Sequence, residues 1–235
     1  MRIEMTVRAA VIGCLVFLVT AALGAGQPKT ILLFNGKVLT GWKTAGGKGT
    51  NQWQVGKAAL DSTDPARLQV TGSGDELISL AKGVNLATEA SFGDCILELE
   101  FMLTKKSNSG VKLMNIYEIQ ILDSFGKAVA GKGDCGAVYQ EAAPKVNACK
   151  KPGEWQTLVI DFRAPRFDAA GKKVAAAKFV KVTLNGQVVQ ENVEVAHGTN
   201  VGRNKPEYPA APVFLQGDHG PVAFRNLKLT PLNQK

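Results

Sequence analysis

Residues 117–124 read YEIQILDS and carry two carboxyl groups, Glu118 and Asp123, and one amide, Gln120, among apolar residues. A carboxylate can act as a general base, and an amide can both donate and accept hydrogen bonds to a polar substrate. The alternation is typical of a β-strand in which the odd-numbered residues face the core and Glu118 and Gln120 face outward. Since an ordinary antiparallel sheet also has a polar face, alternation alone does not distinguish a solvated surface from an active site.

The spacing of the two acids argues against an ordinary paired-carboxylate glycosidase. Retaining glycosidases hold their two carboxyl groups about 5–5.5 Å apart. Asp123 falls on the face opposite Glu118 unless a β-bulge turns the strand. The sequence requires no cofactor, but a divalent metal ion held by Glu118, Asp123 and His219 remains an open alternative, as does a structural role for Asp123.

Two further stretches place polar groups on strand faces. In CILELEFML (95–103), Glu98 and Glu100 lie on the side opposite the leucines, and in VFLQGDHG (213–220) Gln216 lies opposite Leu215. We expect Glu100 and Gln216 to share the polar face with Glu118. His219 follows in a glycine-rich turn and either overhangs this face or is a surface loop histidine.

The elements that must position these residues are strands. Strand-like runs alternate with turn signals throughout, and VTLNGQVVQ places an Asn-Gly turn between two of them. Only 81–89 and 170–177 have a composition that could form a helical turn or two. The pattern predicts an all-β fold, an antiparallel β-sandwich or jelly roll, formed by a single domain over residues 27–235.

The N-terminus has the pattern of a secretory signal peptide over residues 1–26. Arg2 and Arg8 flank a short, positively charged n-region, and an apolar run follows from Ala9 to Val19. AALGAGQ then supplies small residues for cleavage near Gly24 to Gly26. The run is short for a membrane span, and no other segment is long and apolar enough for one. We therefore expect an exported protein, periplasmic or extracellular. VIGC (11–14) resembles a lipoprotein box, but lipid anchoring is the less favoured reading because little apolar sequence precedes the cysteine.

Charge and cysteine usage add two expectations. The formal net charge is +8, but basic residues are scattered among acids with no phosphate-tracking stripe, which argues against a nucleic-acid partner. Export makes a disulfide plausible, and Cys135 and Cys149 lie in neighbouring loop-rich stretches, so we predict that they pair. Cys95 opens a strand-like run and is expected to be a buried free thiol.

Seven motifs, in order, resemble the 3-keto-disaccharide hydrolase domain family. They are LFNGKVLTGW (33–42), SNSGVKL (107–113), YEIQILDS (117–124), CGAVY (135–139), VNACKKPGEWQ (146–156), VTLNG (182–186) and LQGDHGPVAFRNLKL (215–229). The resemblance implies a bacterial, concanavalin-like jelly roll with a concave sugar-binding face. One departure is the stretch KLMNI before Tyr117, where several family members carry arginine or glutamine.

The resemblance also implies a substrate class, glycosides already oxidised to a ketone at C3 by a partner dehydrogenase. The ketone acidifies the proton on C2, so that one base can remove it and the C1 aglycone can leave by elimination, with or without later addition of water. This route needs no second carboxylate at glycosidase spacing.

Carried onto this sequence, the family pattern makes Glu118 and His219 the acid/base candidates. Residues expected to position the sugar or stabilise the enolate are Glu100, Asn108, Gln120, Tyr139 and Gln216. Two alternatives stay open: a non-catalytic, lectin-like carbohydrate-binding sandwich, and a surface protein whose polar face is merely solvated.

Overall fold

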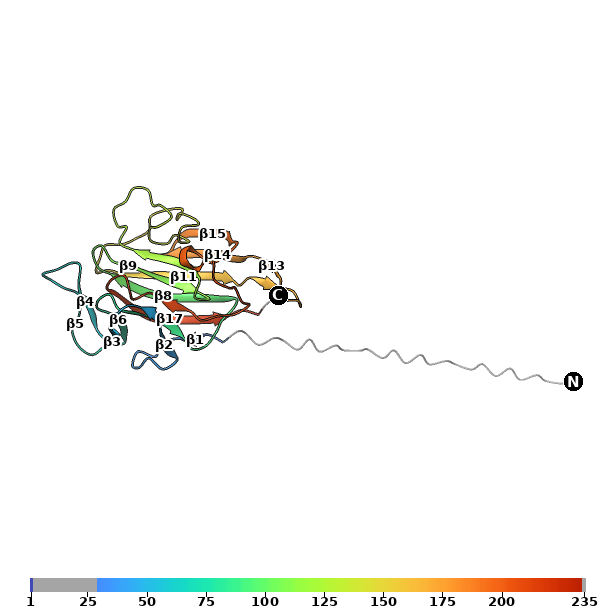
Figure 1. The fold of residues 1–235 in the computed structure, drawn as a ribbon, viewed down its shortest axis with the longest axis horizontal. Helices are drawn as coiled ribbons and strands as arrows, with labels where there is room; N and C mark the ends of the chain where they lie inside the picture. Colours follow the sequence, from blue (N-terminus) through green and yellow to red (C-terminus); the bar gives the residue numbers. More distant parts are fainter. Residues whose placement is uncertain (2–28, 234–235) are drawn as a thin grey trace.

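The computed structural model describes Met1 and residues 29–233, which form strands joined by loops (Figure 1). Within this part of the chain the one helical element is a 3₁₀ turn, η1 (Asn200–Gly202), and no helix there is long and apolar enough to cross a membrane. The predicted signal peptide, its cleavage region and the VIGC stretch lie outside the described residues, apart from Met1.

The larger sheet is antiparallel and is arranged in the order β15-β14-β11-β8-β17-β6-β3, with β1 pairing to β17. Its eight strands in residues 29–233 are β1 (Ile31–Leu32), β3 (Trp53–Gly56), β6 (Glu76–Ser79), β8 (Cys95–Leu103), β11 (Trp155–Arg163), β14 (Ala177–Leu184), β15 (Gln187–Val195) and β17 (Val222–Pro231).

The smaller sheet is also antiparallel, in the order β10-β9-β16-β7-β2, and it carries the stretch YEIQIL on its edge strand. Its five strands in the described chain are β2 (Trp42–Gly47), β7 (Val84–Thr88), β9 (Asn108–Leu113), β10 (Tyr117–Leu122) and β16 (Phe214–Leu215). Two small hairpins complete the fold: β4 (Ala58–Leu60) with β5 (Leu68–Val70), and β12 (Arg166–Phe167) with β13 (Lys173–Ala175).

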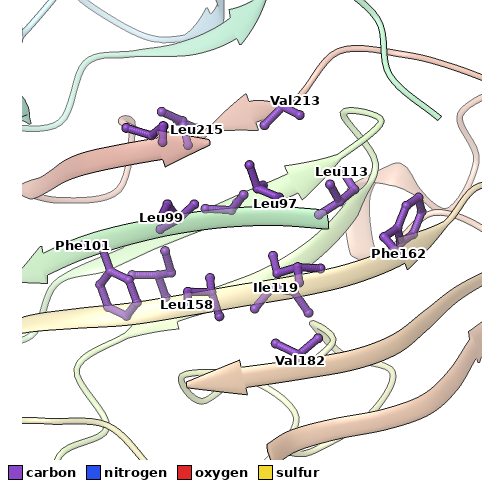
Figure 2. Packing of buried hydrophobic residues seen from close by; sticks show 14 of the residues in the cluster. Leu97, Leu99, Phe101, Leu113, Ile119, Leu158, Phe162, Val182, Val213 and Leu215 are labelled. Atoms are coloured by element: carbon purple, nitrogen blue, oxygen red, sulfur yellow. The ribbon is translucent and has the colours of Figure 1, made fainter. Parts of the chain in front are cut away.

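The core lies between the two large sheets. Leu97, Leu99 and Phe101 of β8 face Ile119 of β10 and Leu113 of β9, and all five are at most 2% exposed (Figure 2). Fully burying such a side chain contributes about 1.5–3 kcal/mol each. Because one face of each strand is committed to this core, the alternate residues of β10 and β9 are forced to the outer face of the smaller sheet.

The predicted class, an all-β antiparallel sandwich, is confirmed, and so is the hairpin at the Asn-Gly turn. Asn185 and Gly186 have φ of 52° and 80° and join β14 to β15, as a two-residue turn with two left-handed positions requires.

Neither of the two segments whose composition could form a helical turn does so. Residues 81–89 contain β7 instead, and residues 170–177 contain β13 and the start of β14. Each segment gains backbone hydrogen bonds by pairing with a neighbouring strand, which a short isolated helical turn cannot match.

Candidate active site

A cavity of about 540 Å³ opens on the outer face of the smaller sheet. Its walls come from strands β2, β7, β9, β10 and β16 and from four loops. The lining residues are Ala45, Gly46, Asn85, Asn108, Lys112, Asn115, Glu118, Gln120, Tyr139, Asn200, Val201, Lys205, Phe214, Gln216, Asp218 and His219.

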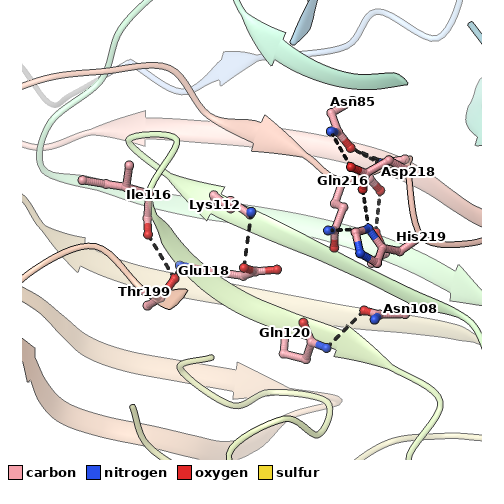
Figure 3. Close-up of polar contacts among 12 residues, drawn as sticks. Asn85, Asn108, Lys112, Ile116, Glu118, Gln120, Thr199, Gln216, Asp218 and His219 are labelled. Carbon is pink, nitrogen blue, oxygen red and sulfur yellow. Dashed lines mark hydrogen bonds and ion pairs between the residues drawn. The ribbon is translucent and has the colours of Figure 1, made fainter. Parts of the chain in front are cut away.

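Strand register places the central groups of the cavity side by side. Glu118 of β10 pairs directly with Lys112 of β9, and Lys112 pairs with Phe214 of β16. Directly opposed residues in an antiparallel pair project from the same face with their Cβ atoms about 4.5–5.5 Å apart. The three side chains therefore form a row across the cavity floor, part of which is seen in Figure 3.

Glu118 and Lys112 form a buried ion pair. Lys112 Nζ lies 3.4 Å from Glu118 Oε2, and the two side chains are only 11% and 4% exposed, respectively. The ammonium also lies 5.0 Å from the centroid of the Phe214 ring, a cation–π contact. Burial raises the pKa of Glu118 above its usual range, while the charge of Lys112 acts to lower it. The result is a desolvated carboxylate with one charged partner, an arrangement suited to a general base.

A glycine makes room for this carboxylate. Gly110 lies on β9 next to Glu118, and a Cβ built there would stand 2.2 Å from Glu118 Oε1 and 3.0 Å from its Cδ. Any larger residue would displace the carboxylate. Gly110 therefore fixes the place of Glu118 by having no side chain.

Loops cover the free edge of β10, which explains why Glu118 and Gln120 are buried rather than solvated. The backbone N–H of Glu118 donates to Thr199 Oγ1 at 3.1 Å, beside turn η1. From the β10–β11 loop, the N–H of Tyr139 donates to the carbonyl of Glu118 on β10 at 3.0 Å. This hydrogen bond brings Tyr139 to the cavity wall. Glu118 and Gln120 are each 3% exposed as a result.

The opposite wall carries a histidine–aspartate pair on the turn after β16. His219 Nδ1 lies 2.5 Å from Asp218 Oδ1, and Asn85 Nδ2 donates to Asp218 Oδ2 at 3.1 Å (Figure 3). Burial acts to raise the pKa of Asp218, but hydrogen bonds from His219 and Asn85 lower it. The Asp218 carboxylate therefore stays ionised. With Nδ1 held by Asp218, Nε2 is the nitrogen of His219 left to exchange a proton, and the side chain is 52% exposed.

Amide side chains complete the polar lining. Gln120 Nε2 donates to Asn108 Oδ1 at 3.1 Å, and Gln216 Nε2 lies 3.0 Å from His219 Nδ1. Gln216 Oε1 is buried, and no hydrogen-bond partner for it is found in the described chain. A buried polar atom normally has a partner, so this oxygen is suited to accept a hydrogen bond from a bound hydroxyl.

Six of the seven acid/base and sugar-positioning residues expected from the sequence line this one cavity: Asn108, Glu118, Gln120, Tyr139, Gln216 and His219. The expectation for Glu100 is wrong. Glu100 lies on β8 in the larger sheet, where its carboxylate accepts hydrogen bonds from Arg225 Nε at 2.8 Å and Asn226 Nδ2 at 2.7 Å. Alternation correctly gave its outward orientation, but it could not show to which sheet the strand belongs.

The structure places Asp123 outside the cavity. Its Oδ2 accepts a hydrogen bond from the backbone N–H of Lys106 at 2.9 Å, which fits the structural alternative. In residues 29–233 no three histidine, cysteine, aspartate or glutamate side chains cluster as metal ligands, so Glu118, Asp123 and His219 do not form the metal site considered above.

Among the lining residues that the sequence did not suggest, three contact the predicted acid and base: Lys112, Asp218 and, through Asp218, Asn85. A signal existed for Lys112, since GVKLM alternates and places lysine on the polar side of its strand. Asp218 directly precedes His219, but only the loop conformation turns its carboxylate toward the imidazole. Asn85 is distant in sequence and gave no signal.

The cysteines lie away from the cavity. Cys95 is a fully buried free thiol, as expected, and burial raises its pKa to about 12. Cys135 and Cys149 are thiols in this structure, with their side chains hydrogen-bonded to each other. That hydrogen bond lowers the pKa of Cys149 and raises that of Cys135. The two sulfurs predicted to pair are thus adjacent, and the covalent bond between them stays a prediction.

Fold and cavity together define the class: a two-sheet, jelly-roll β-sandwich with an acid/base-bearing polar cavity on the outer face of its smaller sheet. The sequence model of the 3-keto-alpha-glucoside-1,2-lyase-like domain matches residues 29–230, and the chain belongs to this family.

Two solved structures are similar to this chain. A Parabacteroides distasonis protein provisionally described as a glycosyl hydrolase is similar to this chain, with 27% identity and a TM-score of 0.65 over 86% of this chain and 84% of that one. A second P. distasonis protein with the same description has 17% identity and a TM-score of 0.55 over 87% and 94% of the two chains, a likeness in fold. A search of curated proteins found no match.

Proposed function

We propose that this protein cleaves the glycosidic bond of 3-keto-glycosides, starting with removal of the C2 proton by Glu118. The observation that carries the proposal is the buried Glu118–Lys112 pair on the cavity floor, 3.4 Å apart. Family membership supports a carbohydrate substrate, and the similar P. distasonis protein supports an enzyme acting on glycosidic bonds.

In the first step the negative charge moves from Glu118 to the substrate, while Lys112 stays positively charged. Glu118 takes the proton from C2 and becomes neutral, while the C–H electron pair passes into an enolate whose negative charge lies on the C3 oxygen. Lys112 then loses one anionic partner and gains another. Because the number of charges in the cavity does not change, the buried site avoids the cost of creating an unpaired ion.

In the second step the enolate electrons re-form the ketone at C3, a double bond forms between C1 and C2, and the bond from C1 to the aglycone oxygen breaks. His219 supplies the proton to that oxygen from Nε2, since Nδ1 is held by Asp218. The product is a 3-keto-2-hydroxyglycal. Addition of water across the new double bond turns this elimination into net hydrolysis, and either outcome is compatible with the proposal.

The amide groups serve to orient the sugar. Gln216 Oε1 has no partner in the described chain, and Gln120 and Asn108 present donors and acceptors on the same face. Tyr139 forms part of the wall beside Glu118. Planar amides can bond neighbouring sugar hydroxyls and so hold the C2–H bond toward the base.

An ordinary double-carboxylate mechanism is less well supported. The two acids among the described lining residues are Glu118 and Asp218, and Asp218 is already bonded to His219 and Asn85.

We further propose that a 3-dehydrogenase acts upstream to oxidise the sugar. The N-terminal pattern of residues 1–26 supports export, so that cleavage would occur outside the cytoplasm.

The test is release of aglycone from 4-nitrophenyl 3-keto-glucosides of both anomers, compared with the unoxidised glucosides. We expect release from the ketone substrates only, and loss of release in Glu118→Gln with an unchanged Tm. Glu100→Gln is the matched control, since this acid also lies on a strand face but outside the cavity, and it should retain full activity. Binding of the keto-glucosides without any release would instead favour the lectin-like alternative.

A further inference from the structure

A second groove of about 420 Å³ adjoins the active-site cavity and shares His219 with it. Its walls come from the β4–β5 hairpin, the β6–β7 loop, the β8–β9 loop and the turn after β16. The lining residues are Ala66, Arg67, Leu80, Ala81, Lys82, Thr104, Lys105, Lys106, Ser107, His219, Gly220 and Pro221.

The groove is lined by positive charge. Arg67, Lys82, Lys105 and Lys106 line it, and no aspartate or glutamate is among its described lining residues. None of these four cations forms an ion pair within residues 29–233. Like charges gathered in one groove repel one another, so an anion bound among them would be stabilised.

The backbone around these cations is fixed by hydrogen bonds. The N–H of Lys105 donates to the carbonyl of Pro65 at 2.7 Å, and the N–H of Lys106 donates to Asp123 Oδ2 at 2.9 Å. Lys106 has φ of 62°, a left-handed conformation that this hydrogen bond helps to hold. Asp123, the acid that does not reach the active site, thus helps to shape the groove.

One of the lining residues, Thr104, carries a buried polar atom without a partner in the described chain. Thr104 is 0% exposed, and its Oγ1 has no hydrogen-bond partner in the described part of the chain. A buried hydroxyl of this kind costs free energy unless a donor or acceptor reaches it.

We propose that this basic groove is the aglycone subsite and that it selects substrates with an anionic group on the aglycone. The inference rests on the proposed function, in which His219 protonates the leaving oxygen. Since the sugar ring lies on the Glu118 side of His219, the aglycone extends to the other side, where the groove begins. Arg67, Lys82, Lys105 and Lys106 then contact the anion.

The experiment compares two 3-keto-glucosides of nearly equal size, with 4-carboxyphenyl and 4-carbamoylphenyl aglycones, using the full mature protein. We expect kcat/KM to be about tenfold higher for the carboxylate at low ionic strength, because each of several cations adds a modest attraction to the carboxylate in the high dielectric of the open groove.

The ratio of the two kcat/KM values should fall as salt approaches about 0.5 M, where the Debye length is shorter than the groove. It should fall toward one in the Lys105→Gln/Lys106→Gln double variant and stay unchanged in Lys172→Gln, an exposed lysine on the β12–β13 turn.

A second measurement separates this proposal from the proposed function. The unoxidised 4-carboxyphenyl and 4-carbamoylphenyl glucosides are titrated into the wild-type protein, and their Kd values are compared. If no keto-glucoside is cleaved but the carboxylate still binds more tightly, the proposed chemistry fails and the anionic groove stands. Equal Kd values, or a kcat/KM ratio near one in the wild type, would overturn the groove proposal whether or not the enzyme is active.

Discussion

Lys112→Met removes the positive charge from the cavity floor while keeping a long side chain of similar volume. At 3.4 Å from Glu118 Oε2, the ammonium interacts with the carboxylate by about 5 kcal/mol at an effective dielectric constant of about 20. Part of this attraction offsets the cost of burying both groups. The pair is thus the main reason that Glu118 can remain ionised while it is 3% exposed.

Two effects on activity are expected, and pH separates them. Lys112 acts to lower the pKa of Glu118, so its removal raises that pKa and moves the acidic limb of kcat/KM to higher pH. Above the new limb Glu118 is ionised again, but the enolate still lacks its cation. There kcat should remain about 10²–10³ lower, the usual loss for one group that stabilises a developing oxyanion.

The raised pKa of Glu118 in Lys112→Met should also change how the free energy of unfolding depends on pH. A carboxyl group whose pKa is raised in the folded state binds its proton more tightly folded than unfolded, so it favours folding at low pH and loses that contribution as pH rises. The free energy of unfolding of Lys112→Met should therefore fall, relative to wild type, as pH rises above the ordinary glutamate value of 4.5.

The assay is aglycone release from a 3-keto-glucoside between pH 4 and pH 9, with thermal unfolding at each pH. Lys178→Met is the matched control, because it breaks the exposed Lys178–Glu194 pair of β14 and β15, 3.8 Å apart, and should change neither profile. An acidic limb that does not move, together with a plateau kcat within about threefold of wild type, would refute the role given to Lys112.

Two other substitutions and one measurement on the unchanged protein test further parts of the structure. Gly110→Ala should lower kcat at least about 10²-fold, since the new Cβ would stand 2.2 Å from Glu118 Oε1, and normal activity would show that the carboxylate can move at no cost. His219→Gln should slow release of an alkyl alcohol by about 10²–10⁴-fold but release of 4-nitrophenol far less, because nitrophenolate leaves without a proton; equal losses would contradict its role as the acid. Mass spectrometry of the non-reduced, exported protein should show the Cys135 and Cys149 peptides linked, and two free thiols would contradict the predicted disulfide.

Alternation alone determined much of the fold. It gave the all-β class, the bounds of β8 and the core and cavity faces of β10, because a strand's side chains must alternate whatever the strand packs against. The Asn-Gly turn of β14–β15 was equally local, since only residues that tolerate positive φ form it. The same local pattern placed Glu118 and Gln120 together on one face.

What the sequence could not give is which strands share a sheet and what covers each face. Glu98 and Glu100 of β8 read like Glu118 and Gln120 of β10, yet β8 lies in the other sheet, and the outer side of its Met102 is buried under the β4–β5 hairpin. These pairings depend on contacts between residues far apart in the chain.

The chemistry of the site was likewise decided by tertiary structure. Cross-strand register placed Lys112 against Glu118, and the loops at Thr199 and Tyr139 closed the edge of β10 and removed the carboxylate from water. Burial and a single charged neighbour are properties of a place in the fold rather than of a residue type. For that reason the sequence determined that an acid faces outward here, and only the folded protein gave that acid the buried, lysine-paired setting that suits a general base.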